Sequence, residues 1–259
     1  MKVKVAVAQY EVPNSHLDAL VKLSKVVASA SFFNVKILVV PETALGVLRD
    51  VKSTEQDYLP DLVNIAKQNN IYIASSFYRK EKNKYFNQGY IVSDEGEVVV
   101  RHQKIYLAPP EREEDGISPG NLLDIKRTEY GNLGMLICKD VFNDFSHFLY
   151  RKYDKLKADI LCIPTWSLTF KELNTQEYIK TLYTYGAFTS RSFVLVSGNL
   201  NVSTGSFGRA MIISPIRGVI KEASTNHEEL LVEELDLDKV KKARDFHSWW
   251  QPDKKVEIK

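Results

Sequence analysis

Apolar runs of strand length alternate with segments of helical spacing through the first third of the chain. The runs are rich in valine and isoleucine, which favour strands, and they occupy residues 3–10, 35–40 and 71–78. From His16 to about Phe33 the apolar residues instead recur at helical intervals, and Ser15 stands where a helix cap is expected. With a further helix near residues 55–69, this order predicts a sheet covered on both faces.

The pattern changes near residues 85–104, where two strand-like segments flank Asp94, Glu95 and Gly96 and predict an antiparallel hairpin. The second half of the chain resembles the first in plan. Its expected strands are 122–127, 133–138, 158–164, 192–200, 209–215, 218–223 and 230–237, and its expected helices are 144–157 and 171–185. We therefore expect an α/β protein, a four-layer α-β-β-α sandwich of two mixed sheets. It forms one domain over residues 1–259, in which residues 236–259 are a C-terminal extension.

The composition argues against several classes of protein but does not by itself indicate an activity. The formal net charge is +2 and the charges are dispersed, which predicts neither a nucleic-acid partner nor a membrane partner. Two cysteines in 259 residues argue against a disulfide framework, and the first ten residues lack the apolar core of a signal peptide, so we expect a cytoplasmic protein. The histidines show no metal-ligand spacing and no glycine-rich phosphate loop is present, so no metal and no other cofactor is expected.

Three chemically competent residues follow apolar runs that lie far apart in the chain: Glu42, Lys104 and Cys138. Side chains at strand ends converge in α/β sheets, and these three would supply a base, a cation for an oxyanion and a nucleophile. A thiol near a helix start and a cation is expected to have a lowered pKa. Each residue taken alone also fits a structural role: Glu42 as a loop carboxylate, Lys104 as an edge charge and Cys138 as a buried small side chain. Cys162, flanked by apolar residues, is interpreted as core.

Four short motifs, in this order, resemble the nitrilase, or carbon–nitrogen hydrolase, superfamily: VAVAQ, PETALG, HQKIYL and GMLICKD. Later segments, ADILCIPTW, FVLVSGN and GRAMIISPIRGVI, extend the resemblance over roughly residues 1–235. The resemblance implies that Cys138 is the nucleophile and Glu42 the general base. Lys104 would hold the oxyanion with the backbone N–H of Lys139. The implied substrate is a small molecule with a non-peptide C–N bond, most simply an amide. Nitrile or N-carbamoyl-amine hydrolysis stays open, as does a catalytically silent relative that binds another protein.

The resemblance also implies a second glutamate that orients the site. Glu113, nine residues after Lys104, is preferred on spacing, and Glu111 after Pro109 and Pro110 is the alternative. Trp166 is a candidate wall of the substrate pocket, or else a packed core residue.

A homodimer or larger homo-oligomer is expected, held in part by an aromatic tail that contains Phe246, Trp249 and Trp250. The alternative is that this tail covers the chain's own sheet.

Overall fold

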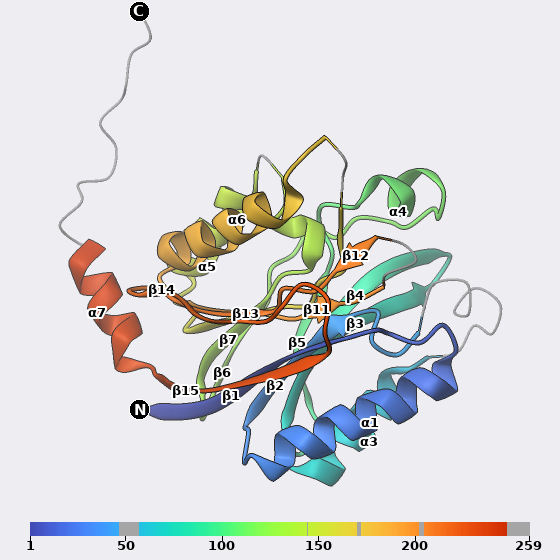
Figure 1. Ribbon diagram of the computed structural model, residues 1–259, viewed down its shortest axis with the longest axis horizontal. Helices are drawn as coiled ribbons and strands as arrows, with labels where there is room; N and C mark the ends of the chain where they lie inside the picture. The colour runs from blue at the N-terminus through green and yellow to red at the C-terminus, as the bar shows by residue number, and fades with distance from the viewer. Residues whose placement is uncertain (47–56, 144, 170–171, 202–204, 248–259) are drawn as a thin grey trace, which may run out of the picture.

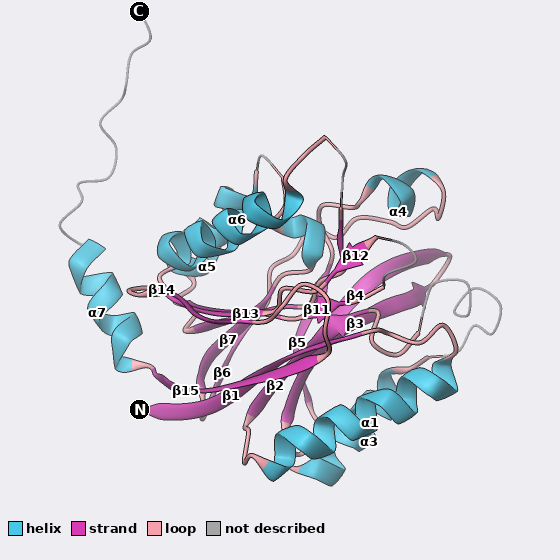
Figure 2. Ribbon diagram, viewed as in Figure 1, coloured by secondary structure: helices cyan, strands magenta, loops and turns pink. Residues whose placement is uncertain are grey.

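The computed structural model describes residues 1–46, 57–143, 145–169, 172–201 and 205–247. Two β-sheets pack face to face, with α1 and α3 on one outer side and α5 and α6 on the other (Figures 1 and 2). This is the α/β arrangement of mixed sheets and covering helices that the alternating pattern predicts.

The first sheet has seven strands in the order β11-β1-β2-β3-β4-β5, and β15 also pairs with β1. Strands β1, β2 and β3 are parallel, whereas β3, β4 and β5 form an antiparallel meander that contains the expected hairpin. The bounds are β1 Lys2–Tyr10, β2 Ile37–Glu42, β3 Tyr72–Glu81, β4 Lys84–Val92, β5 Val98–Gln103, β11 Gly198–Asn199 and β15 Glu229–Asp236.

The second sheet has six strands in the order β14-β13-β10-β8-β7-β6, with β7, β8 and β10 parallel at its centre. Its bounds are β6 Ile125–Thr128, β7 Gly131–Met135, β8 Ile160–Ile163, β10 Phe193–Val196, β13 Met211–Ser214 and β14 Gly218–Glu222. A two-stranded ribbon joins β9 Ser167–Leu168 to β12 Ser206–Phe207.

The described helices α1, α3, α5 and α6 cover the outer faces of the two sheets, whereas α4 and α7 lie to the side of these layers. Their bounds are α1 His16–Phe32, α3 Leu59–Asn69, α4 Pro109–Glu113, α5 Ser146–Lys155, α6 Thr175–Ser190 and α7 Asp238–His247, with a 3₁₀ turn, η1, at Cys138–Asp140. The predicted cap of α1 is confirmed, because the Ser15 side chain accepts a hydrogen bond from the Asp18 N–H at 3.2 Å.

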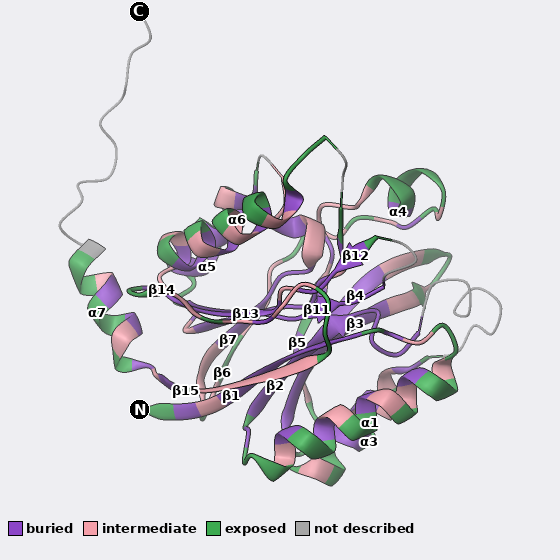
Figure 3. Cartoon of the chain, in the orientation of Figure 1, coloured by how far each residue is buried: buried purple, intermediate pink, exposed green. Residues whose placement is uncertain are grey.

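Burial follows the layers, with buried strands at the centre and exposed faces on the helices (Figure 3). Successive residues of β1 show why: Val5 and Val7 lie in the core between the sheets, whereas Ala6 and Ala8 lie in the core beneath α1 and α3. Alternate side chains of a strand point to opposite faces, so a strand buried on both faces must be apolar throughout. This accounts for the unbroken apolar runs in the sequence.

Two boundaries near Cys138 differ from the expectation. Strand β7 ends at Met135 and α5 begins only at Ser146, and residues 136–143 form a loop with the turn η1 rather than a strand followed at once by a helix. Cys138 has a φ of 38°, which is neither strand nor right-handed helix and stops the ladder before it.

The described part of the C-terminal extension packs on its own chain. Leu237, Val240 and Ala243 are buried at the edge of the two sheets, and Arg244 Nη1 lies 3.1 Å from Asp159 Oδ1. Figure 1 places α7 beside the N-terminus, where the Met1 amino group contacts Asp238 at 3.2 Å. Of the three aromatic residues of the tail, the structure describes Phe246, whose side chain is 61% exposed.

Trp249 and Trp250, the tail residues expected to anchor a dimer, lie outside the described residues. Among the helices that are described, none is long and apolar enough to cross a membrane.

Candidate active site

The structure brings together the three residues singled out at the ends of apolar runs. Glu42 is the last residue of β2, Lys104 follows β5, and Cys138 opens η1 after β7. The Lys104 ammonium lies 2.7 Å from Glu42 Oε1, and the Cys138 thiol interacts with the same carboxylate. Two of the positions come from the first sheet and one from the second, so the site lies where the two sheets meet.

Backbone hydrogen bonds hold these positions in place across the two sheets. Glu42 N–H donates to the Thr165 carbonyl at 3.4 Å, and Cys138 N–H donates to the Pro164 carbonyl at 3.0 Å. Both acceptors belong to the segment that follows β8. The last residue of β2 and the first residue of η1 are therefore hydrogen-bonded to the same loop. This loop fixes the separation of Glu42 and Cys138.

A buried carboxylate ties the lysine to the nucleophile turn. Asp140 Oδ1 accepts from the backbone N–H groups of Ile105 and Tyr106, directly after Lys104, at 2.8 and 2.9 Å. Its Oδ2 accepts from Ile137 N–H at 2.9 Å and lies 2.7 Å from His102 Nε2. Asp140 and His102 have fully buried side chains, so this brace is shielded from competing water.

Cys138 occupies a sparsely populated backbone conformation. A φ of 38° is uncommon for a residue other than glycine, and it persists only where the surroundings impose it. The thiol donates to the Trp166 carbonyl at 3.3 Å. The residue is thus held in a tight turn with its sulfur directed to a defined place.

The second glutamate at the site is Glu111, and the preference for Glu113 is wrong on placement. Glu111 is buried and its Oε2 lies 2.7 Å from Lys104 Nζ, whereas Glu113 is exposed. The physical reason is the start of α4. Pro109 and Pro110 open this helix, and the carboxylate of its third residue turns back to accept the Ala108 N–H at 2.8 Å.

Charge and burial set the protonation of the site. Burial and Glu111 raise the pKa of Glu42 despite the opposing influence of Lys104. Burial disfavours the Lys104 ammonium, but Glu42 and Glu111 outweigh it and raise the lysine pKa well above its ordinary value. Lys104 is therefore a permanent cation between two carboxylates.

The expectation of a lowered thiol pKa at Cys138 is wrong. Burial raises the pKa of this thiol, and the nearby Glu42 charge raises it further, against the smaller influence of Lys104. Since the residue opens a three-residue 3₁₀ turn, no long helix starts at the thiol to supply a compensating dipole. The resting sulfur is a protonated thiol that needs a base.

The remaining predicted residues divide between the site and the core. Trp166 is half-buried and adjoins the thiol through its carbonyl, while its indole Nε1 is buried with no hydrogen-bond partner among the described residues. Lys139 is half-buried, with its ammonium 5.0 Å from the centre of the Phe142 ring. Cys162 is fully buried between the sheets, where burial raises its pKa to about 12, as expected for a core thiol.

Three further residues at the site were not predicted. Asn87 donates to both Glu42 and Glu111, and Tyr78 OH contacts Glu111 at 3.3 Å. The pKa of Tyr183 is raised well above its ordinary value, first by burial and then by the neighbouring Cys138. The sequence could have pointed to Asn87, because it is a polar residue at a buried position of the strand segment YFNQGYIV. Tyr183, in the long helix α6, carried no such signal.

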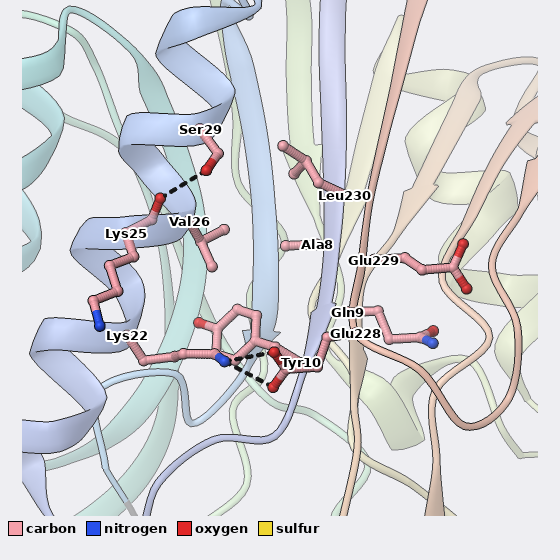
Figure 4. Close-up of a pocket in the computed structure, with 10 residues that line it drawn as sticks. All are labelled: Ala8, Gln9, Tyr10, Lys22, Lys25, Val26, Ser29, Glu228, Glu229 and Leu230. Carbon is pink, nitrogen blue, oxygen red and sulfur yellow. Dashed lines mark hydrogen bonds and ion pairs between the residues drawn. The ribbon is translucent and has the colours of Figure 1, made fainter.

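A separate cavity of about 210 Å³ lies between α1 and strands β1 and β15 (Figure 4). Two of its charged lining residues, Lys22 and Glu228, pair with each other at 2.6 Å, and neither Glu42 nor Cys138 lines it. In the described part of the chain, no cluster of three or more His, Cys, Asp or Glu side chains could hold a metal ion. The charged cluster at the sheet junction is therefore the candidate site.

Comparison with known proteins places this site in a family. The carbon–nitrogen hydrolase family model matches residues 4–245. The deaminated glutathione amidase of Dictyostelium discoideum is 25% identical over 199 residues, which are 70% of this chain and 66% of that protein. The omega-amidase NIT2 of Danio rerio is 23% identical over 254 residues, which are 91% of this chain and 89% of that protein.

Coverage of the relatives is uneven. The chain spans 66% of the Dictyostelium protein and 39% to 40% of two further curated relatives. A carbon–nitrogen hydrolase from Helicobacter pylori G27 has the same fold, with a TM-score of 0.85 at 17% identity over 96% of this chain and 94% of that one. Because the family model covers nearly the whole sequence, the chain belongs to the carbon–nitrogen hydrolase family.

Proposed function

We propose that the protein hydrolyses a non-peptide C–N bond of a small molecule, most simply an amide, through a thioester on Cys138. The observation that carries the proposal is the buried set in which Lys104 Nζ lies 2.7 Å from both Glu42 and Glu111 while the Cys138 thiol interacts with Glu42. This set combines a base, a cation and a nucleophile at one point.

Acylation begins with proton transfer from the Cys138 thiol to Glu42. The sulfur then attacks the carbonyl carbon, and the negative charge that develops on oxygen is held by Lys104 and by the backbone N–H of Lys139. Collapse of this tetrahedral intermediate breaks the C–N bond. The nitrogen leaves as ammonia or an amine after taking the proton from Glu42, and a thioester remains on Cys138.

Deacylation reuses the same groups. A water molecule occupies the place of the departed amine, and Glu42 removes one of its protons as the oxygen attacks the thioester carbon. Lys104 again stabilises the oxyanion. The C–S bond breaks, the sulfur recovers its proton from Glu42, and a carboxylic acid is released.

The choice of an amide rests on the names of the relatives, which include two amidases. The test is turnover of a panel of ω-amides, N-carbamoyl-amines and nitriles, followed by ammonia release. Faster turnover of the amides supports the proposal, whereas nitriles or carbamoyl-amines as the preferred class would replace it. Turnover of none of the three classes would favour a catalytically silent relative that binds another protein.

Alkylation of Cys138 separates an enzyme from a silent relative. A buried structural thiol is alkylated slowly, with or without an amide present. A thiol that a neighbouring base can deprotonate is alkylated faster, and a small amide bound at the same site protects it. Iodoacetamide labelling of both cysteines, with and without amide, makes Cys162 the internal reference.

The pH dependence of the reaction is expected to follow the ionisation of Glu42. Glu42 must be ionised to accept the thiol proton, so activity is lost as pH falls through its pKa. Burial raises this pKa above the ordinary value of 4.5, so the acid limb of kcat/KM is expected above pH 4.5. A pH–rate profile measures it, and an acid limb below pH 4.5 would contradict the role of a buried base.

The second prediction uses a matched pair on α4. Glu111→Gln removes one of the two carboxylates that balance Lys104, so kcat should fall at least about 100-fold, within the range for a group that orients acid–base catalysis. Glu113→Gln changes the same atoms at an exposed position and should leave kcat within about twofold of the parent, as is usual for surface changes. The reverse ranking would restore Glu113 as the supporting residue.

We also propose that the protein forms a homodimer. Its support is a set of aromatic side chains exposed on α5 and α6, with exposed fractions of 46% to 55% at Phe148, Tyr178, Tyr185 and Phe188. The third prediction is therefore a dimer mass by light scattering at micromolar concentration; a monomer would contradict it.

The part of the tail beyond α7 has its own test. Deleting residues 248–259 leaves the packed residues of α7 in place and should shift the mass toward monomer if the tail contributes. A truncated protein that stays dimeric would refute the role of the tail but not the dimer.

A further inference from the structure

We propose that Asn87 is a positioning residue that decides which oxygen of Glu42 serves as the base. The proposal rests on the function proposed above. Asn87 lies in β4, is fully buried, and donates from Nδ2 to Glu42 Oε1 at 2.7 Å and to Glu111 Oε1 at 2.8 Å. One neutral amide thus contacts both carboxylates of the site.

Glu42 Oε1 is engaged twice. It accepts from Asn87 Nδ2 and from Lys104 Nζ, both at 2.7 Å. A carboxylate oxygen has about two lone-pair sites, so these two donors fill Oε1. A proton from the thiol therefore goes to Oε2, because at Oε1 it would have to displace a donor. The geometry assigns Oε2 as the atom that serves Cys138.

Glu111 has a different pattern of contacts. Its Oε1 accepts from Asn87 and from the Tyr78 hydroxyl, and its Oε2 accepts from Lys104 and from the Ala108 N–H. Both oxygens are filled, so Glu111 has no atom left for a proton from the thiol. The two glutamates are thereby assigned separate tasks, with Glu111 as an anchor and Glu42 as the base.

The four side chains form a closed ring. Asn87 joins Glu42 to Glu111 on one side and Lys104 joins them on the other, by hydrogen bonds of 2.7 to 2.8 Å. Without Asn87, the Glu42 carboxylate would keep a single donor on Oε1 and could rotate about its last bond. Lys104 alone would then have to hold two carboxylates that repel each other.

The backbone supports this role. The Lys104 N–H donates to the Asn87 carbonyl at 2.9 Å, and Asn87 pairs with Tyr78 across β3 and β4. The orientation of the amide follows, because its two close contacts, Glu42 Oε1 and Glu111 Oε1, are acceptors and only the NH₂ group can donate. Its Oδ1 is left buried with no partner among the described residues, a cost typical of functional positions.

The test exchanges the donor for a carboxylate of equal shape. Asn87→Asp replaces the NH₂ group by an oxygen and adds a charge beside Glu42 and Glu111, within the cluster that also contains Lys104 and Tyr78. The iodoacetamide alkylation rate of Cys138 is measured against pH, since it reports the base without a substrate. The acid limb should move up by at least about one pH unit, because a nearby like charge disfavours the ionised carboxylate. Amide hydrolysis should lose at least about 100-fold in kcat with KM changed less than about threefold.

Two further variants complete the design. Asn83→Asp adds the same charge at an exposed turn before β4 and should leave both profiles unchanged. Asn87→Ala removes the donor without a charge, so the acid limb should still move up, and it serves if Asn87→Asp does not fold.

The possible outcomes separate the positioning role of Asn87 from the proposed hydrolysis. Asn87 variants with lower thermal stability but an unmoved acid limb would overturn the proposal and leave Asn87 a structural residue. If no substrate is turned over while alkylation still depends on Asn87, the proposed hydrolysis fails and the positioning role stands. If hydrolysis depends on Cys138 but not on Asn87, the proposed hydrolysis stands and the positioning role of Asn87 fails.

Discussion

Cys138→Ala is expected to abolish hydrolysis while leaving the fold intact. Alanine removes the only atom that can form the thioester, and loss of a nucleophile costs more than about 10⁴-fold in kcat in comparable enzymes. The change deletes one sulfur beside an internal turn, so thermal unfolding should move little. Ammonia release from the best amide and a melting curve measure the two effects.

Cys162→Ala is the matched control for this result. It deletes the same atom from a fully buried core position, at a cost of about 1 kcal/mol in the free energy of unfolding, as for one buried methyl-sized group. Its kcat should stay within about twofold of the parent, as expected for a change away from the reacting atoms. Equal activity of Cys138→Ala and the parent would remove the nucleophile from the mechanism.

Glu42→Gln has the second large effect, a fall in kcat of at least about 10³-fold, since general base catalysis contributes up to about 10⁴-fold. Glutamine keeps the size of the side chain and can still accept the Lys104 hydrogen bond, but it cannot take a proton from the thiol. Because burial raises the pKa of Cys138, the sulfur reaches the thiolate only slowly near neutral pH without this base.

The Glu42→Gln result has a substrate-free counterpart. Alkylation of Cys138 should slow in this variant, while Cys162 in the same sample reacts as before. If Glu42→Gln keeps more than about a tenth of the parent's kcat, well outside the loss expected for a missing base, another group accepts the proton.

Most of the fold could be predicted because strands that are buried on both faces of a sheet appear in the sequence as unbroken apolar runs. All six residues of β2, Ile37–Glu42, are buried, and residues 35–40 could be recognised from VKILVV as a strand covered on both sides for that reason. Ser15 was predicted as a cap because its hydroxyl is placed to satisfy a free N–H at the start of α1. These signals are local, so they survive without knowledge of the rest of the chain.

The supporting glutamate shows where spacing fails. Spacing after Lys104 favoured Glu113, but position within α4 decides which carboxylate turns inward. Pro109 and Pro110 mark the helix start, and the rule that the third helical residue reaches back to the cap would have selected Glu111. The information was present in the sequence as turn chemistry.

The thiol pKa and the ring through Asn87 could not be obtained in the same way. The direction of the Cys138 shift depends on how much burial and Glu42 outweigh Lys104, which is a balance of distances in three dimensions. Asn87 acts through carboxylates 45 residues before it and 24 after it. No local pattern reports such a contact.

Cys138 is expected to carry the acyl group of the substrate during turnover. The most direct test is peptide-mapping mass spectrometry of Glu42→Gln after incubation with a small amide that the parent hydrolyses. Without a base to activate water, a thioester that forms slowly should persist. We expect an added mass equal to the acyl group on the peptide that contains Cys138 and none on the peptide that contains Cys162. An acyl adduct on any other residue would contradict it.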